Sequence, residues 1–230
     1  MSNEHANTVE LIGTYGGDLS HALSAWTSTS RDLSDEKRAR TQSLLTMLAT
    51  NEHHTPFEKS SLHFLVTTDI ASHIHLLKHR IGVSLNAESA RYKELKEDKF
   101  YLPNDWPQEE LKELEEFNKL AFEKYHRTLK SLVAKGFSKK RAKESARYFL
   151  TYSNQITADV MFNFRSFAHM VLLRLPDSAQ REISWLTYQM LLAVKETKQF
   201  DQTFQAFGFY ELMEEAVKRF ESRGLDTPAS

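Results

Sequence analysis

KHRIGVSLNAESARY, residues 78 to 92, marks the point where a predicted helix gives way to a polar loop. A stripe of apolar residues at helical spacing predicts the helix over residues 69–81: Ile70, Ile74, Leu77 and Ile81. Residues 82–92 show no sustained period and predict a structured loop. Arginine side chains and loop N–H groups suit a dianionic phosphate. The same composition also fits a solvated basic helix end, where cations offset the helix dipole.

Outward from this stretch, hydrophobic periodicity predicts many helices and a few short strands. The predicted strands are residues 8–12, 62–66 and 155–162. The predicted helices are residues 18–26, 34–50, 69–81, 107–134, 138–149, 163–173 and 178–195. The expected N-caps of these helices are Asp18, Asn163 and Ser178, and Ser138 is expected to start the helix 138–149. Thr55-Pro56-Phe57-Glu58 has the pattern of a capping box.

These elements predict the α+β (α/β) class. We expect a single helix-rich domain over residues 1–230, with a core at about 9–207, a helical tail at 208–230 and a small mixed or antiparallel sheet. Forty per cent of the 230 residues are apolar and 27% are charged, which is enough apolar material for a packed core. No linker rich in Pro, Gly or Ser divides the chain.

Composition also excludes several classes of protein. Thirty Lys and Arg against 31 Asp and Glu give a net charge of −1, which excludes a generally basic nucleic-acid coat protein. The absence of cysteine excludes disulfides, thiolate metal sites and every cysteine-nucleophile mechanism. The polar start MSNEHANTVE and the absence of a long apolar run predict a cytoplasmic protein with no membrane partner.

Short motifs for phosphate, metal and hydrolase sites are missing. The sequence contains no G-x-G-x-x-G, no P-loop and no G-x-S-x-G. His75 and His79 have metal-ligand spacing, but Lys78 and Arg80 beside them would repel a cation. Glu123-x-x-His126 occurs once, whereas a di-iron bundle needs two such motifs. We therefore expect no metal site.

A second polar cluster follows residue 162: Asn163, Arg165, His169 and Arg174. At about 100° per residue, Arg174 falls on the side of the predicted helix opposite to Arg165 and His169, so a site shared between subunits would use both faces. Arginines that only snorkel to solvent would give the same spacing. Downstream, the basic helix 139–147 fits a solvated face, with Arg147 set apart among apolar neighbours.

Taken together, five motifs resemble the flavin-dependent thymidylate synthase family. The family's Arg-His-Arg, seven residues, Ser pattern is similar to KHRIGVSLNAESARY, and its His-x-x-Pro-Phe-Glu-His segment is similar to HHTPFEK at 53–59. FYLP at 100–103, NFRSFAHMVLLRL at 163–175 with SAQREI at 178–183, and TFQAF at 203–207 continue the likeness in order. The resemblance runs from about residue 9 to 207.

This resemblance implies reductive methylation of dUMP to dTMP. Methylenetetrahydrofolate would supply the carbon, and NADPH would reduce a bound FAD that supplies the hydride. The resemblance also implies an α/β fold and a homotetramer whose active sites lie between subunits. It implies no obligatory nucleic-acid partner. The lack of cysteine agrees, because the unrelated type of thymidylate synthase uses a cysteine nucleophile.

The resemblance also assigns roles position by position. Positions that match FAD contacts are Thr55, Lys78, His79, Arg80, Asn163, Arg165 and His169, with Ala87 as a further candidate. Positions that match dUMP contacts are His75, Lys78, Glu88, Ser89, Ala90, Arg91, Arg147 and Arg174. Arg174 matches the catalytic arginine that polarises the uracil, and a guanidinium aimed at developing negative charge is an effective electrostatic catalyst.

The chain departs from the family pattern at four places. Lys78 replaces the first Arg of the motif, and eight residues rather than seven separate Arg80 from Ser89, so either Ala87 or Glu88 fills the family's glutamate position. His75 stands where Gln is usual, and Ser178 where His is common. Two rivals stay open: a relative acting on another pyrimidine nucleotide, and an inactive nucleotide- or RNA-binding module that uses helix 139–147.

Overall fold

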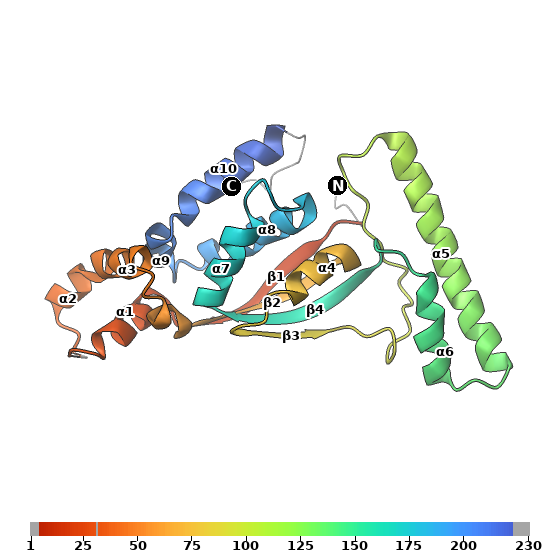
Figure 1. Cartoon of the computed structure of the whole chain (residues 1–230), viewed down its shortest axis with the longest axis horizontal. Helices are drawn as coiled ribbons and strands as arrows, with labels where there is room; N and C mark the ends of the chain where they lie inside the picture. The colour runs from red at the N-terminus through yellow and green to blue at the C-terminus, as the bar shows by residue number, and fades with distance from the viewer. Residues whose placement is uncertain (1–4, 31, 223–230) are drawn as a thin grey trace. The chain divides into compact units, whose positions relative to one another are not determined.

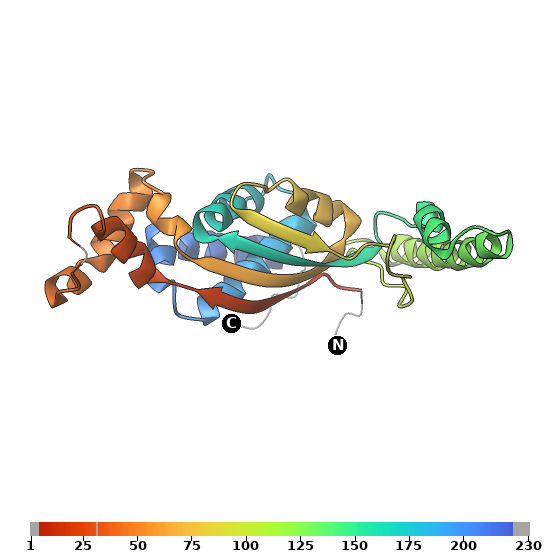
Figure 2. The ribbon, with the colours of Figure 1, turned by 90° about the horizontal axis from the view of Figure 1, so that it is seen from below.

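The computed structural model describes residues 5–30 and 32–222, and its fold is helix-rich with a small sheet. The strands are β1 (Thr8–Tyr15), β2 (Ser61–Asp69), β3 (Val83–Ala87) and β4 (Gln155–Asn163). They form one sheet in the order β1-β2-β4-β3, with neighbouring strands antiparallel (Figure 2). The α+β class and the antiparallel alternative predicted for the sheet are confirmed.

The chain divides into two compact units. Among the described residues, the first comprises 5–8, 67–76 and 86–158, and we call it the α5 unit. The second comprises 9–30, 32–66, 77–85 and 159–222, and we call it the α7 unit. The single domain expected over residues 1–230 stays a prediction, and residues 223–230 of the expected tail lie outside the described part.

The α7 unit is built around aromatic packing. Its helices are α1 (Asp18–Trp26), α2 (Asp35–Ala39), α3 (Thr41–Thr50), α7 (Phe164–Arg174), α8 (Arg181–Glu196), α9 (Asp201–Ala206) and α10 (Phe209–Ser222), with a 3-10 helix η1 at Thr55–Glu58. Phe64 and Phe162 point from β2 and β4 onto Phe167 of α7, with ring centroids 5.8 and 6.0 Å away. Phe164 stacks on Phe200 at 5.3 Å. Each buried ring removes a large apolar surface from water, so this packing fixes α7 firmly.

The α5 unit contains a helical hairpin. α5 (Gln108–Ala134) and α6 (Lys139–Ala146) lie side by side (Figure 1), and the 3-10 helix η2 (Arg147–Phe149) follows. Its buried core is Leu95, Phe100, Phe122, Tyr125 and Ala146. Ser138, where a helix was expected to start, is the N-cap of α6, and its hydroxyl accepts from the Arg141 N–H at 3.2 Å. The helix α4 (Ile70–Leu77) begins in this unit.

Several predicted boundaries are wrong. β1 continues through Gly13 to Tyr15, because the turn uses the positive φ of Gly16 (83°). The helix expected over 34–50 breaks at Arg40 into α2 and α3. The helix expected over 69–81 ends at Leu77, which leaves Ile81 90% exposed instead of buried.

The expected loop 82–92 contains β3. Its half-buried residues Val83, Leu85 and Ala87 alternate with the exposed Ser84 and Asn86. This is the two-residue period of a strand, which the short polar side chains concealed.

Three of the expected caps have other roles. The Asp18 carboxylate lies in the first turn of α1 and accepts from the N–H groups of Gln202 and Thr203 at 2.9 and 2.8 Å, so it caps α9. η1 shows no side-chain cap from Thr55. α8 begins at Arg181 with Gln180 as N-cap, because residues before it form a turn in which Ala179 N–H bonds the Pro176 carbonyl.

Candidate functional site

A cavity of about 620 Å³ lies within the α7 unit. Its walls are η1, the turn from Lys78 to Val83, one face of α7 and Phe207 after α9. This volume lies inside the range of about 300–1,000 Å³ that is usual for cofactor and substrate sites. The turn at 78–83 and the start of α7 therefore converge, as the two polar clusters of the sequence suggested.

Local hydrogen bonds hold the turn against α7. The Asn163 side chain caps α7 by accepting from Ser166 N–H at 2.8 Å, as expected. The Asn163 N–H donates to the Gly82 carbonyl at 3.0 Å, and the Ser166 hydroxyl donates to the Ile81 carbonyl at 2.6 Å. Gly82 has φ +66°, and a Cβ there would lie 2.3 Å from Asn163 Nδ2. The close approach thus requires glycine.

The cavity is strongly cationic. The basic and imidazole side chains that line it are Lys78, Arg80, Arg165, Arg174, His54, His79 and His169. Among the described lining residues Glu58 is the one carboxylate, and Arg165 Nη1 donates to its Oε1 at 2.6 Å. Leu172, Leu173 and Phe207 add apolar surface. A ligand with anionic groups and a flat apolar part fits this lining.

Arg174 lines the same cavity as Arg165 and His169, which corrects the expectation that they use opposite faces. Arg174 is the last residue of α7, and its Nε lies 3.1 Å from Nε2 of His79. A long side chain at a helix end can turn along the helix, so the angular argument does not apply to it. Sharing between subunits is therefore not needed to bring these residues together.

Most of the predicted FAD-contacting residues meet here. Lys78, His79, Arg80, Asn163, Arg165 and His169 all line the cavity. Thr55 does not, and its neighbour His54 takes that place. Glu58, Ser166 and Phe207 also line it and were not selected from the sequence. His54 and Glu58 stand within the quoted HHTPFEK, so that segment carried a usable signal.

The loop at Ser89 belongs to the α5 unit. The Ser89 carbonyl accepts from the N–H groups of Tyr92 and Lys93, both at 2.9 Å, and the Ser89 hydroxyl accepts from Arg91 N–H at 3.3 Å. The Arg91 Nε donates to the Glu144 carboxylate of α6. This hydrogen bond lowers the pKa of Glu144. The guanidinium lies 5.4 Å from the Tyr92 ring centroid. The loop is thus folded back on itself and tied to α6.

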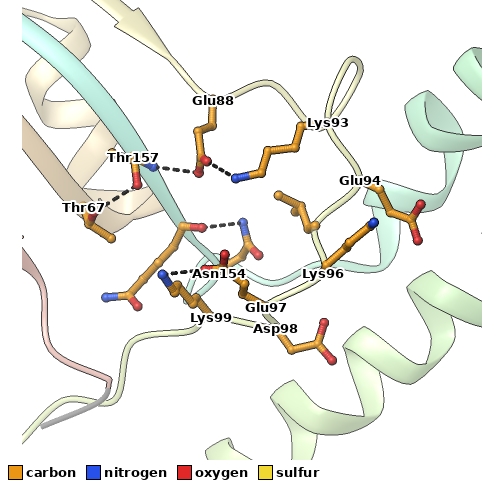
Figure 3. Close-up of a pocket in the computed structure, with 12 residues that line it drawn as sticks. Thr67, Glu88, Lys93, Glu94, Lys96, Glu97, Asp98, Lys99, Asn154 and Thr157 are labelled. Atoms are coloured by element: carbon orange, nitrogen blue, oxygen red, sulfur yellow. Dashed lines mark hydrogen bonds and ion pairs between the residues drawn. The ribbon is translucent and has the colours of Figure 1, made fainter.

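Glu88 faces a second cavity, of about 490 Å³, within the α5 unit (Figure 3). Its carboxylate accepts from Lys93 Nζ at 2.5 Å and from Thr157 N–H at 3.1 Å. The Lys93 contact raises the pKa of that lysine. The Thr157 hydroxyl is bonded in turn to that of Thr67 at 2.9 Å, so these contacts join the loop to β4 and β2. Lysines and carboxylates both line this cavity, so its charge favours neither sign.

The remaining predicted dUMP positions are spread over the α5 unit. His75 is half-buried on α4, and Ala90 packs against the hydrophobic core of the unit. Arg147 is exposed at the start of η2. Ala87 ends β3. Their roles stay predictions.

Within residues 5–30 and 32–222, no group of three or more His, Cys, Asp or Glu side chains is arranged to hold a metal ion. No helix in that part of the chain is both long and apolar enough to cross a membrane.

Comparison with known proteins gives a match over most of the chain. Residues 10–198 match the family model described as thymidylate synthase complementing protein. A flavin-dependent thymidylate synthase of Tropheryma whipplei (strain TW08/27) is 29% identical over 191 residues, covering 73% of this chain and 75% of that protein. One from Streptomyces avermitilis is 35% identical over 102 residues, covering 43% of this chain but only 41% of the relative.

Solved structures show the same likeness. The chain is similar to the UMP/dUMP methylase PolB of Streptomyces cacaoi bound with 5-Br dUMP, with a TM-score of 0.74 and 27% identity over 88% of this chain and 94% of that one. The same methylase bound with 5-Br UMP gives a TM-score of 0.73 over 90% and 95% of the two chains.

Proposed function

Because the chain belongs to the family of thymidylate synthase complementing proteins, we propose that it is a methyltransferase that reductively methylates dUMP to dTMP. In this proposal methylenetetrahydrofolate is the carbon donor, FAD is the bound cofactor, and NADPH is the reductant. The names of the relatives and of the methylase structures support a flavin and a uridine nucleotide.

The observation that carries the proposal is the cationic cavity of the α7 unit. Its lining fits FAD, since Lys78, Arg80 and Arg165 offer charge for the pyrophosphate and Leu172 and Phe207 offer apolar surface for the ring. When bound, the flavin supplies reversible hydride chemistry. The protein would bind it, orient it and keep water away from its ring.

For the nucleotide we assign the loop at 88–91 together with Arg147. The fold of this loop holds Ser89 and Arg91 in fixed positions. In our assignment these residues bind the phosphate of dUMP. Arg174 would polarise the uracil, because its guanidinium can stabilise negative charge that develops on the pyrimidine oxygen.

We also infer a homotetramer. Leu77 is about half exposed and Ile81 is almost fully exposed, although both are large apolar residues. Apolar surface of this kind is typical of contacts between subunits. A second copy of the chain would cover it.

The direct test is release of tritium from [5-³H]dUMP with NADPH, FAD and methylenetetrahydrofolate present. We expect release that depends on all three and a protein that purifies with the visible absorption band of oxidised flavin. The variant Arg174→Ala should lose most of its turnover, with a small residual rate, and keep the flavin, because the proposal places the other cavity cations on the cofactor. Flavin binding without any tritium release would contradict the proposed reaction.

Two rivals have specific support. The methylase of the comparison binds analogues of both UMP and dUMP, so the same assay with [5-³H]UMP tests whether the ribonucleotide is a substrate.

The second alternative is RNA binding by the exposed Lys139, Lys140 and Arg141 on α6. Two results together would favour that function. The native chain would bind RNA in a salt-dependent way without turning over dUMP, and substitution of all three residues by Gln would abolish the RNA binding.

A further inference from the structure

The contact between His79 and Arg174 joins two residues to which the sequence gave separate roles. Nε of Arg174 donates to Nε2 of His79 at 3.1 Å. The two residues are 95 positions apart and line the same cavity of the α7 unit. His169, one turn before Arg174 on α7, faces the His79 ring edge to face, with 6.3 Å between ring centroids.

The direction of this hydrogen bond fixes the state of the imidazole. An arginine Nε–H can only donate, so Nε2 of His79 must be the acceptor. The ring is therefore neutral, and its own proton is on Nδ1. The contact uses Nε of Arg174, and its two terminal amino groups take no part in it. Those groups are the part of the guanidinium that a ligand in the cavity would meet.

We propose that His79 is a positioning residue for Arg174, holding the guanidinium in one orientation toward the uracil. An arginine side chain has several rotatable bonds, and fixing them before the ligand arrives removes an entropic cost from the reaction. The backbone end of Arg174 is already fixed, since Val171 and Leu175 beside it are buried. His79 fixes the other end. The kinetic consequence rests on the proposed function, whereas the contact itself does not.

Two variants separate the acceptor from the ring. His79→Gln keeps an acceptor close to the position of Nε2, and His79→Phe keeps a flat ring without an acceptor. With flavin saturating, we expect His79→Phe to lower kcat for dUMP by about tenfold or more, the usual effect of losing one hydrogen bond to a charged group. His79→Gln should keep most of kcat. Equal losses in both variants would overturn the proposal, because they would indicate a role of the ring alone.

A double-mutant cycle tests whether the effect passes through Arg174. In an Arg174→Ala background, His79→Phe should cause little further loss in single-turnover rate. Losses that multiply would show independent roles and overturn the proposal. His169→Phe serves as the matched control, since that ring lines the same cavity but, in the described part of the chain, the hydrogen bond of Arg174 is to His79 and not to His169. Its loss should multiply with that of Arg174→Ala.

A measurement independent of turnover uses NMR of the imidazole nitrogens and carbons in the full chain. At neutral pH, His79 should show the Nδ1–H tautomer, and Arg174→Ala should shift the tautomer balance toward Nε2–H. A ring protonated on Nε2 in the native chain, or one unchanged by Arg174→Ala, would overturn the proposal even if the chain turns over dUMP. Conversely, the expected tautomer without dUMP turnover would leave the contact established and reject the proposed reaction.

Discussion

At the scale of single residues, a buried chain of hydrogen bonds gives the α7 unit a defined pH response. The Thr203 hydroxyl donates to Asp18 at 2.6 Å, so it accepts from His21 Nδ1 at 3.0 Å, and His21 Nε2 accepts from the Ser60 hydroxyl at 2.7 Å. His21 is neutral in this arrangement and fully buried. Burial lowers its pKa from 6.5 to about 3.

The sign of the effect follows from linkage. Between pH 6.5 and about 3 the unfolded chain carries a proton on His21 and the folded chain does not. The contribution of His21 to the free energy of unfolding is therefore fully present above pH 6.5 and is lost as the pH drops through this window. We expect the urea midpoint of the native chain to fall steeply between about pH 7.5 and about pH 4, a range that spans this window. The midpoint of His21→Gln should fall less steeply over the same range.

Asp18 also titrates with folding, so it contributes to the pH dependence measured in that experiment. Burial raises the pKa of its carboxyl, so its contribution has the opposite sign and is lost as the pH rises through the folded value. The comparison between the native chain and His21→Gln cancels this contribution because Asp18 is present in both. Equal slopes in the two proteins would show that His21 is not neutral in the fold.

Gly82 gives a second prediction at this scale. Gly82→Ala should lower the free energy of unfolding by about 2 kcal/mol or more, because it adds backbone strain at positive φ and a steric clash. It should also weaken flavin binding, since Gly82 lies against Asn163 and Ser166 in the cavity wall. Gly136→Ala is the matched control, with φ +87° and no atom within 4 Å of the added Cβ. Similar losses in both would show that the clash is unimportant.

The contact between Arg91 and Glu144 gives a third prediction at the scale of single residues. If Glu144 fixes Arg91 for a phosphate, Glu144→Ala should weaken dUMP binding about threefold to tenfold, the usual cost of ordering one long side chain. Glu144→Gln, which keeps an acceptor for Nε, should lose less. Titration calorimetry with dUMP measures both. Tighter binding in Glu144→Ala would mean that the carboxylate competes with the phosphate.

At the scale of elements, Asp18 joins α1 to the start of α9. Its carboxylate accepts from the N–H groups of Gln202 and Thr203 as well as from the Thr203 hydroxyl. We expect Asp18→Ala to lower the free energy of unfolding by about 1–3 kcal/mol in urea titrations, because it leaves buried donors unpaired. Asp18→Asn keeps one acceptor oxygen and should lose less. No change in Asp18→Ala would mean that water replaces the carboxylate.

The success of sequence-based prediction differed between kinds of element. Long periodic helices such as α5 were predicted within one residue, because a sustained apolar stripe leaves no competing arrangement. β3 was missed, since Ser84 and Asn86 on its exposed face resemble a loop. Asp18 was assigned to α1 because the sequence shows only its nearest helix, whereas its partners are more than 180 residues away.

The site was predicted in part for the same reason. The motifs assigned His79 and Arg165 to FAD and Arg174 to the uracil, and these three residues line one cavity. The contact between His79 and Arg174 was beyond reach, since helical spacing describes where a Cα lies and not where a long side chain ends. The likeness to the flavin-dependent thymidylate synthase family is confirmed, and the cytoplasmic location and tetramer stay predictions.

At the scale of the whole molecule, the inferred tetramer can be tested at its exposed apolar surface. Ile81→Glu should reduce the mass measured by sedimentation, because a charge on a subunit contact has to be buried without a partner. Met47→Glu on α3 is the matched control, since Met47 is also an exposed apolar residue. A native chain that sediments as a monomer at all concentrations would reject the tetramer directly.

The walls of the cationic cavity come from residues 54–58, 78–83, 163–174 and 207. During synthesis the chain therefore has only the first two of these four segments until α7 has been made. The hydrogen bonds that close the turn at Gly82 cannot form before then, because they involve Asn163 and Ser166. Contacts between such distant segments form late in folding. Cofactor loading should then follow translation, and chains truncated before residue 163 should emerge colourless however much flavin surrounds them.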